Sequence, residues 1–551
     1  MKKIILSFLT PVIFFAGTAT AQLYVSSGST FIIQPGGIVT VQGDVTTNAD
    51  IQGGGKVVLK GSANQNVNTN GFSISNLEMD NTANATITGN TRISSSILFT
   101  NGKISAGNFN VNFADVATST GGGTNKFIET NGTGQVIKEL TANVTDAEIP
   151  VGVGSIYRPA FITSSGTYSN ANVGIKVVAA VDPNRPVSLS EMIAAYWPVT
   201  KTGVTGTVTV GGKYDDADIS GTESFLRGYF YNGTDWSSVG STNDAPTNRV
   251  SAVITAASGD VTGLDNFTLV KAKAFLMGAY VGGTNLMTEA LRTTGSPGTN
   301  LIPSGDPYLT APYNTFYTHV NNPITVNAPA AVFNDQGIAG DNITDWVFLE
   351  LRNNATSGNQ VLATRSALIQ RDGDIVDVDG ISPVTFNRMV TGNYTLAIRH
   401  RNHLAISTDP TVFQHLFGEV KSTAPLVDFT AATDAEIFGD NNAYKRNVTD
   451  NKITLWSGDA NADGTVKYAG TSKDPTNILA QVLGFPGNTS GLYSYNSALG
   501  YFPGDINMDR KVKYSGTSPI DPGLILTNVL AYPPNTGGLY SYSLFTRQLP
   551  N

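Results

Sequence analysis

A segment near the carboxyl end of the chain occurs twice, and this duplication restricts what the tail can form. Residues 458–468 (GDANADGTVKY) return as residues 504–514 (GDINMDRKVKY). Each copy continues through Gly-Thr-Ser to an Asp-Pro pair and a short apolar stretch, and ends in Gly-Leu-Tyr-Ser-Tyr at 491–495 and 538–542. An internal repeat indicates one structural unit built more than once. We therefore expect tandem units over residues 450–551, each with a short helix after its Asp-Pro pair.

The first copy carries oxygen ligands at alternate positions. Asp459, Asn461 and Asp463 are followed by Gly464, which permits a sharp turn, and the carbonyl of Thr465 would be the next ligand. This is the first half of an EF-hand-type calcium loop, and calcium takes six to eight oxygens. The twelfth position is Gly470 where an EF-hand has glutamate. We expect Asp474, at the start of the predicted helix, to replace it.

The second copy offers the corresponding ligands. They are Asp505, Asn507, Asp509, the carbonyl of Lys511, and Asp521. This loop is one residue longer, and Arg510 stands where the first copy has glycine. A positive φ is costly for a residue other than glycine, so we expect the second site to bind Ca²⁺ more weakly or not at all.

These repeats resemble the dockerin-type calcium-binding modules of secreted bacterial proteins, in a variant with Val-Lys-Tyr-x-Gly found in Bacteroidetes surface proteins. The resemblance covers residues ~455–545. It implies Ca²⁺ as the bound ion and a small α-helical C-terminal module. Because dockerins bind cohesin domains, it also implies a cohesin-like domain as one partner.

Upstream of the tail the pattern predicts strands. Over residues 22–118 short β-type runs recur between glycine and asparagine turn signals, with no helical stretch. A β-solenoid and a β-sandwich both fit, and the dense Asn and Thr content favours the solenoid. We expect β-sandwich domains over 119–272 and 273–433, with hairpins at Asn232-Gly233 and Asp372-Gly373. The fold class is therefore all-β with a small helical tail.

Several upstream stretches resemble parts of Bacteroidetes adhesin and haemagglutinin-like proteins. They are residues 149–152 (IPVG), 157–159 (YRP), 345–352 (DWVFLELR), 376–380 (VDVDG) and 399–404 (RHRNHL). This resemblance implies a surface-associated binding protein.

The first residues read as an export signal. Lys2 and Lys3 precede an apolar stretch over 4–17, and Ala19-Thr20-Ala21 forms a small-x-small cleavage pattern before Gln22. We therefore expect residues 1–21 to be removed, an extracellular or outer-surface location, and no transmembrane segment in the mature chain. The chain has no cysteine, and a net charge of -8 offers no basic face for nucleic acid.

No motif singles out a catalytic centre, so we expect no enzyme. G-x-S-x-G and H-E-x-x-H are absent, and thiol chemistry requires a cysteine. His400 and His403 lie three positions apart, where strand geometry directs them to opposite faces unless Arg401 forms a loop. Trp236, Trp346 and Trp456 could stack on sugars, but we expect each to fill a core.

We expect an adhesin-like binding and structural protein with calcium-stabilised repeats, whose partner is an extracellular glycan or a surface protein. The alternative is a non-catalytic carbohydrate-binding or scaffold component of a polysaccharide-degrading system.

Overall fold

The computed structural model describes residues 22–292, 300–322, 326–353, 360–412, 415–544 and 549. The predicted export signal therefore lies outside the described residues. The chain is mostly β, with 42% strand and two α-helices in the described part. It divides into two compact units, described separately below. Unit 1 holds the residues up to 180 with 195–217 and 246–262, and unit 2 holds 181–194, 218–245 and 263–551. No helix within the described ranges is both long and apolar enough to cross a membrane.

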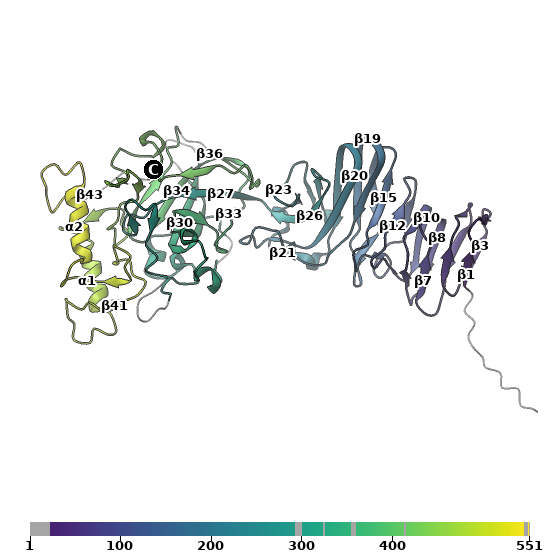
Figure 1. Ribbon diagram of the computed structural model, residues 1–551, viewed down its shortest axis with the longest axis horizontal. Helices are drawn as coiled ribbons and strands as arrows, with labels where there is room; N and C mark the ends of the chain where they lie inside the picture. Colours follow the sequence, from purple (N-terminus) through teal and green to yellow (C-terminus); the bar gives the residue numbers. More distant parts are fainter. Residues whose placement is uncertain are drawn as a thin grey trace, which may run out of the picture. The chain divides into compact units, whose positions relative to one another are not determined.

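Unit 1 begins with strands stacked in parallel, one for each turn of the chain (Figure 1). In pairing order they are β1 (Leu23–Val25), β4 (Val45–Thr47), β7 (Gln65–Asn68), β9 (Ala85–Ile87), β11 (Ile104–Ser105), β14 (Ile128–Glu129) and β17 (Val151–Val153). Leu23 pairs with Val45, and Val45 pairs with Val67, so each of these turns takes 22 residues. This is the β-solenoid-like arrangement expected for the N-terminal region, and its parallel pairing continues beyond residue 118.

The other strands of each turn stack in the same way. They are β2 (Phe31–Ile32), β3 (Ile38–Val41), β5 (Ile51–Gln52), β6 (Lys56–Leu59), β8 (Ser73–Asp80), β10 (Thr91–Asn101), β12 (Val111–Phe113) and β13 (Thr118–Thr120). Val41, Leu59, Met79 and Phe99 lie in register on four successive turns, and all four are buried. Burial of one apolar side chain above another holds the turns together.

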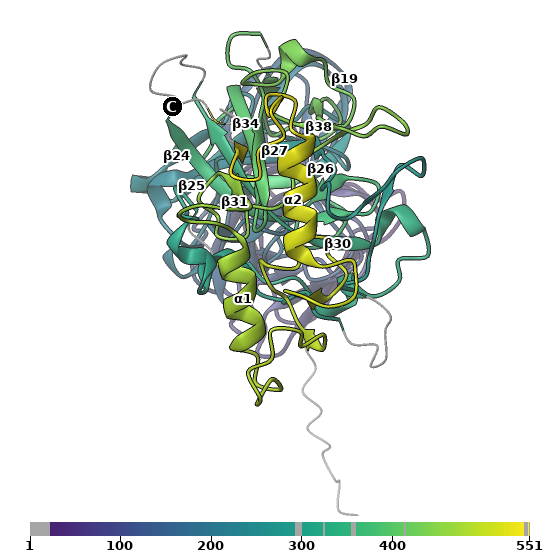
Figure 2. The same cartoon turned by 90° about the vertical axis from the view of Figure 1, so that its left-hand side faces the viewer.

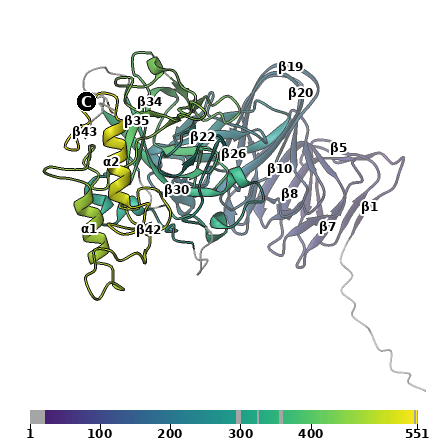
Figure 3. The same cartoon turned by 60° about the vertical axis from the view of Figure 1, so that its left-hand side comes forward.

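A long antiparallel hairpin continues the sheet of unit 1 (Figure 3). Its strands are β19 (Ala160–Ile175) and β20 (Met192–Lys213), and β19 also pairs with β15 (Val136–Leu140) and β16 (Val144–Ile149). Strand β25 (Arg249–Val253) pairs with β20. The buried Trp197 packs on Gly212, where a Cβ atom would lie 2.3 Å from the indole ring. Only glycine fits at that position.

Unit 2 is built on a large mixed sheet. Its main path is β33 (Val384–Asn387), β27 (Phe267–Lys273), β32 (Asp374–Val376), β31 (Val361–Gln370), β30 (Ile343–Arg352), β34 (Gly392–His400) and β35 (His403–Ser407), with β36 (His415–Phe417) on β34 and β37 (Leu426–Asp428) on β27. All ten residues of β30 are buried, so both faces of this strand are covered. The apolar runs at 346–352, 362–369 and 394–400 lie in β30, β31 and β34.

Both hairpins expected from turn chemistry are present. Gly373 has φ +94° between β31 and β32. Strands β22 (Leu226–Tyr231) and β23 (Trp236–Ser237) flank Asn232-Gly233, and Tyr229 packs with Trp236 and Phe267 beneath the turn. The local sequence was sufficient in both places because the turn type depends on a few adjacent residues.

The tail of unit 2 contains the two helices, α1 (Pro475–Leu483) and α2 (Asp521–Ala531), which lie beside each other (Figure 2). Short strand pairs join β40 (Val466–Lys467) to β43 (Ser543–Leu544), and β41 (Ala498–Leu499) to β42 (Lys511–Val512). Matched apolar residues of the two repeats share one core: Val466 and Val512, Ile478 and Ile525, Val482 and Val529. Leu404 of the large sheet belongs to the same core, so the tail packs on that sheet.

Candidate metal centre

The first loop folds around the carboxylate of Asp459. Asp459 Oδ1 accepts the amide of Asp463 at 3.0 Å, and Oδ2 accepts the amide of Gly464 at 3.0 Å. Asp463 Oδ1 then accepts the amide of Thr465 at 2.9 Å. The side-chain amide of Asn461 donates to Asp463 Oδ2 at 3.1 Å. These contacts hold the side chains of Asp459, Asn461 and Asp463 close together on the inside of one loop.

The second loop repeats these contacts. Asp505 accepts the amides of Asp509 at 3.0 Å and Arg510 at 2.9 Å, and Asp509 accepts the amide of Lys511 at 3.0 Å. The side-chain amide of Asn507 again donates to Asp509, at 3.0 Å. Two sequences that differ at several positions therefore adopt the same loop geometry.

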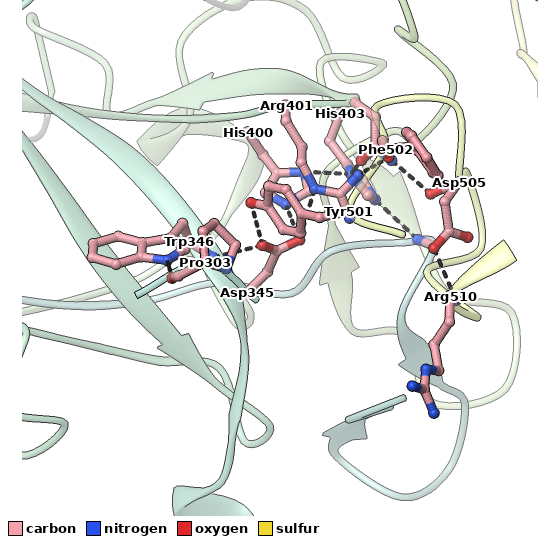
Figure 4. Close-up of polar contacts among 12 residues, drawn as sticks. Pro303, Asp345, Trp346, His400, Arg401, His403, Tyr501, Phe502, Asp505 and Arg510 are labelled. Carbon is pink, nitrogen blue, oxygen red and sulfur yellow. Dashed lines mark hydrogen bonds and ion pairs between the residues drawn. The ribbon is translucent and has the colours of Figure 1, made fainter. Parts of the chain in front are cut away.

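The backbone angles of the two loops also correspond. Ala462 and Met508 have φ values of +57° and +55°, and Gly464 and Arg510 have +79° and +82°. The expected positive φ at Arg510 is therefore present. Such a conformation costs a residue other than glycine about 1 kcal/mol. The guanidinium of Arg510 points away from the Asp505 carboxylate (Figure 4).

A further carboxylate reaches each loop from the start of a helix, as the sequence predicts. Asp474 precedes α1 and accepts the amides of Lys467 at 2.7 Å and Asn461 at 3.3 Å. Asp521 begins α2 and accepts the amides of Lys513 at 2.7 Å and Ile506 at 2.8 Å. Neither carboxylate caps its own helix, because both turn back toward the loop.

Burial and mutual repulsion act on these carboxylates. Burial, with the negative charge of Asp463, raises the pKa of Asp459 to about 7. Burial, with the charge of Asp459, raises the pKa of Asp474 to about 8. In the second loop burial raises the pKa of Asp521 to about 7, and burial with the charge of Asp521 raises the pKa of Asp505 well above its usual range. A cation placed between such groups would relieve the repulsion.

The donor set fits a hard cation that accepts oxygen ligands. Asn507 Oδ1 is buried and has no hydrogen-bond partner among the described residues, although the amide nitrogen of the same side chain donates to Asp509. In the described ranges no three His, Asp or Glu side chains are gathered closely enough to hold a metal by themselves. Ca²⁺ would therefore need Asn461 or Asn507 and the carbonyl of Thr465 or Lys511 in addition to the carboxylates.

A buried turn of the large sheet contacts both loops, and Figure 4 shows its side chains beside Asp505 of the second loop. Strand β34 ends at His400 and β35 begins at His403, so Arg401 and Asn402 form the turn between them. The carbonyl of Asn402 accepts the amide of Gly458, which precedes the first loop, at 2.9 Å. The side chain of Asn402 donates to the carbonyl of Asp505 at 2.7 Å. We refer to residues 399–403 as the docking turn.

The hydrogen bonds of the docking turn fix the tautomers of its two histidines. The amide of Gly278 donates to His403 Nε2 at 3.0 Å, so that nitrogen carries no proton. His403 Nδ1–H then lies 2.9 Å from His400 Nδ1 and 2.7 Å from Asn402 Oδ1. His400 donates through Nε2 to Asp345, at 3.1 Å. Both rings are therefore neutral, and burial lowers the pKa of each.

Asp345 anchors the docking turn to strand β30. It accepts hydrogen bonds from Tyr501 at 2.6 Å, Arg401 Nε at 3.0 Å and His400. Although burial opposes its charge, Arg401 and the donated hydrogen bonds lower the pKa of Asp345 to about 2. Arg401 is fully buried and also donates to the carbonyl of Phe502. The arrangement uses every ring nitrogen of the histidine pair for structure.

The structure brings the predicted residues of each loop together, and it also shows the docking turn, which the sequence analysis did not predict. Arg401 does form the loop that brings His400 and His403 together, yet the two rings bond to each other and to neighbouring groups. Trp236, Trp346 and Trp456 are all buried in cores, as expected.

Comparisons with known proteins do not assign the chain to a family. No family profile, curated protein or solved structure matches the chain.

Proposed function

We propose that this is a secreted, adhesin-like binding and structural protein whose C-terminal repeats bind Ca²⁺ and thereby hold the tail on the large sheet of unit 2. The repeats would act as dockerin-like modules. The solenoid would provide reach, and the sheets of 119–272 and 273–433, for which we keep the expectation of β-sandwich packing, would provide contact area. Its partner would be an extracellular glycan or surface protein, with a cohesin-like domain as a further candidate for the repeats.

The proposal is carried by one observation: two loops of different sequence hold Asp459 and Asp505 in the same hydrogen-bonded geometry, each with a second buried carboxylate from a helix start. Burying acidic groups together is costly unless a cation or proton compensates their charge. A structural unit that does so twice at equivalent positions favours a bound ion over a surface turn.

The test uses the chain from Gln22 onward, because the tail shares a core with Leu404 and is not a separable fragment. The protein is stripped with chelator and titrated with CaCl₂ in a calorimeter, with thermal melts in parallel. We expect the first loop to bind one ion and the second loop to bind more weakly, with stabilisation by mass action of about 2.7 kcal/mol at one hundred times Kd.

The double variant Asp459→Asn with Asp505→Asn keeps the shape of both side chains and should abolish the heat of binding. Asp335→Asn is the matched control, because Asp335 lies at an exposed turn and accepts the amide of Gly337, a role that an asparagine oxygen can also fill. Identical melting in chelator and in Ca²⁺, with no heat of binding, would remove the calcium assignment.

A further inference from the structure

We infer that a pocket beside the second loop binds a neutral saccharide. The inference that Ca²⁺ controls this pocket rests on the proposed function, whereas the binding of sugar does not. The cavity measures about 660 Å³, which is within the range of small-molecule sites. Residues 301–313 form one side, and Gln481 with residues 501–503 forms the other.

The pocket combines aromatic and rigid apolar surface. Tyr313, Tyr501 and Phe502 line it together with four prolines: Pro303, Pro307, Pro312 and Pro503. Aromatic rings next to polar groups are suited to the apolar C–H faces of sugar rings. Tyr501 is held in place, because its hydroxyl donates to Asp345 and the guanidinium carbon of Arg401 lies 4.4 Å from its ring centre.

The charge of the lining favours a neutral ligand. Its residues are all described, and they include no lysine, arginine or histidine. The carboxylate of Asp306 is already engaged, since it accepts the amide of Tyr308 at 2.9 Å and contacts His319 Nε2 at 2.9 Å. A phosphorylated or acidic ligand would therefore find no cation on the pocket surface.

Uncharged polar groups remain for a ligand. Gln481 accepts the amide of Gly504 through Oε1 at 3.0 Å, and its NH₂ group makes no hydrogen bond within the described part of the chain. Ser304 is exposed and its hydroxyl makes none there either. Thr310 donates to the carbonyl of Pro307, so its oxygen can still accept. One amide and two hydroxyls around aromatic rings match the hydroxyl groups of a sugar.

A proline-rich peptide is the competing ligand, since such peptides also bind aromatic grooves. Phenol hydroxyls in such a groove could donate to peptide carbonyls. Here the hydroxyl of Tyr501 is bonded to Asp345, and that of Tyr313 is buried away from solvent. The rings of both residues line the pocket, but neither hydroxyl is available to donate to a peptide carbonyl. This favours a saccharide as the ligand.

The second loop fixes one side of the pocket. Residues 501–503 lead directly into Gly504 and Asp505, and the carbonyl of Phe502 accepts both the amide of Asp505, at 3.3 Å, and the guanidinium of Arg401. Any change in the position of Asp505 on ion binding therefore acts on Phe502. We infer that Ca²⁺ in the second loop orders this side of the pocket and tightens sugar binding.

The experiment titrates the chain from Gln22 onward with neutral trisaccharides (cello-, malto-, xylo-, manno- and N-acetylchito-) by calorimetry and saturation-transfer NMR, in Ca²⁺ and in chelator. Ser304→Trp and Thr310→Trp fill the pocket from exposed positions and should weaken binding at least tenfold. Ser490→Trp, at an exposed position outside the lining, should leave it unchanged.

The outcomes separate the two proposals. If Ca²⁺ binds with heat but no trisaccharide does, the pocket assignment is wrong and the calcium proposal stands. If sugar binds equally well in chelator and no ion binds, the calcium proposal is wrong and the pocket assignment stands. Binding unaffected by Ser304→Trp and Thr310→Trp, or binding of a polyproline peptide that Ser304→Trp blocks, would overturn the saccharide inference.

Discussion

The side-chain amide of Asn402 donates a 2.7 Å hydrogen bond to the main-chain carbonyl of Asp505, a residue 103 positions later in the chain. Asn402 is fully buried, and its own carbonyl accepts the amide of Gly458. One residue of the large sheet thus contacts the beginnings of both candidate loops. The loops are therefore part of the fold of unit 2 and do not form a free tail.

Replacing Asn402 should weaken this attachment. Asn402→Ala leaves the carbonyl of Asp505 buried without that donor and removes an acceptor for His403 Nδ1, so we expect a loss of about 1–3 kcal/mol in the free energy of unfolding. Ca²⁺ affinity of the second loop should fall more than that of the first. Chemical denaturation and calorimetry measure both effects. Asn441→Ala, at an exposed position, is the control. Equal stability of the two variants would contradict the role of Asn402.

The residue at the positive-φ position should set the relative affinity of the two loops. A Cβ atom added to Gly464 has open space around it, so Gly464→Ala tests backbone strain alone. We expect it to lower Ca²⁺ affinity at the first loop by about fivefold, corresponding to about 1 kcal/mol. The reciprocal Arg510→Gly should raise affinity at the second loop. Calorimetric titration of both variants resolves the two sites. No change in either would show that the loops tolerate this φ without cost.

Without Ca²⁺ the protein should lose stability as the pH rises through neutrality. The pKa values of Asp459, Asp474 and Asp521 are raised to about 7, 8 and 7, against about 3.9 in an unfolded chain. The folded state therefore binds more protons than the unfolded state between these values. The contribution of these protonated carboxyl groups to the free energy of unfolding is fully present below pH ~4 and is lost as pH rises through ~7–8.

The effect of the buried histidines on stability has the opposite pH dependence and falls in a different pH range. Because the pKa values of His400 and His403 are lowered, their contribution is present above pH ~6.5 and declines at more acid pH. Thermal melts in chelator between pH ~6.5 and ~8.5 therefore report mainly the carboxylates, and the melting temperature should fall. Saturating Ca²⁺ should remove most of that fall. A melting temperature that rises with pH in chelator would contradict the charge repulsion in the loops.

The stacked interior of the solenoid predicts a large cost for one truncation. Leu59 lies between Val41 and Met79 on adjacent turns and is fully buried. Leu59→Ala should destabilise unit 1 by about 2–5 kcal/mol. Ile38→Ala, at a side chain that is 60% exposed, should cost far less. Urea denaturation followed by circular dichroism compares the two, and similar midpoints would mean that the interior packing of the turns carries little of the stability.

Much of the fold could be predicted where the controlling residues are neighbours in sequence. Asp372-Gly373 and Asn232-Gly233 specify hairpins through local turn geometry. Their spacing likewise predicted that Asp459, Asn461 and Asp463 share one loop, and the repeat predicted the same for Asp505 and its counterparts. The same local logic anticipated the positive φ of Arg510.

The docking turn could not be predicted in this way. Asn402 meets Asp505 only after more than one hundred residues of chain have folded, and no local pattern marks such a contact. The residues 399–403 are charged and polar, which suggests an exposed turn, but His400 and Arg401 are buried. Asp345 accepts a hydrogen bond from each of them, His403 contacts the other ring nitrogen of His400, and the carbonyl of Phe502 accepts from Arg401. The pocket beside Tyr501 depends on the same long-range packing.

The solenoid of unit 1 has one more consequence, which concerns length. Since Leu23, Val45 and Val67 recur at equal intervals and each turn contacts mainly the turn before and after it, a whole turn of 22 residues can be inserted or deleted without breaking the pairing of the others. Each such step would change the height of the stack by about 4.8 Å, the spacing of paired strands. The number of turns therefore sets the height of this region.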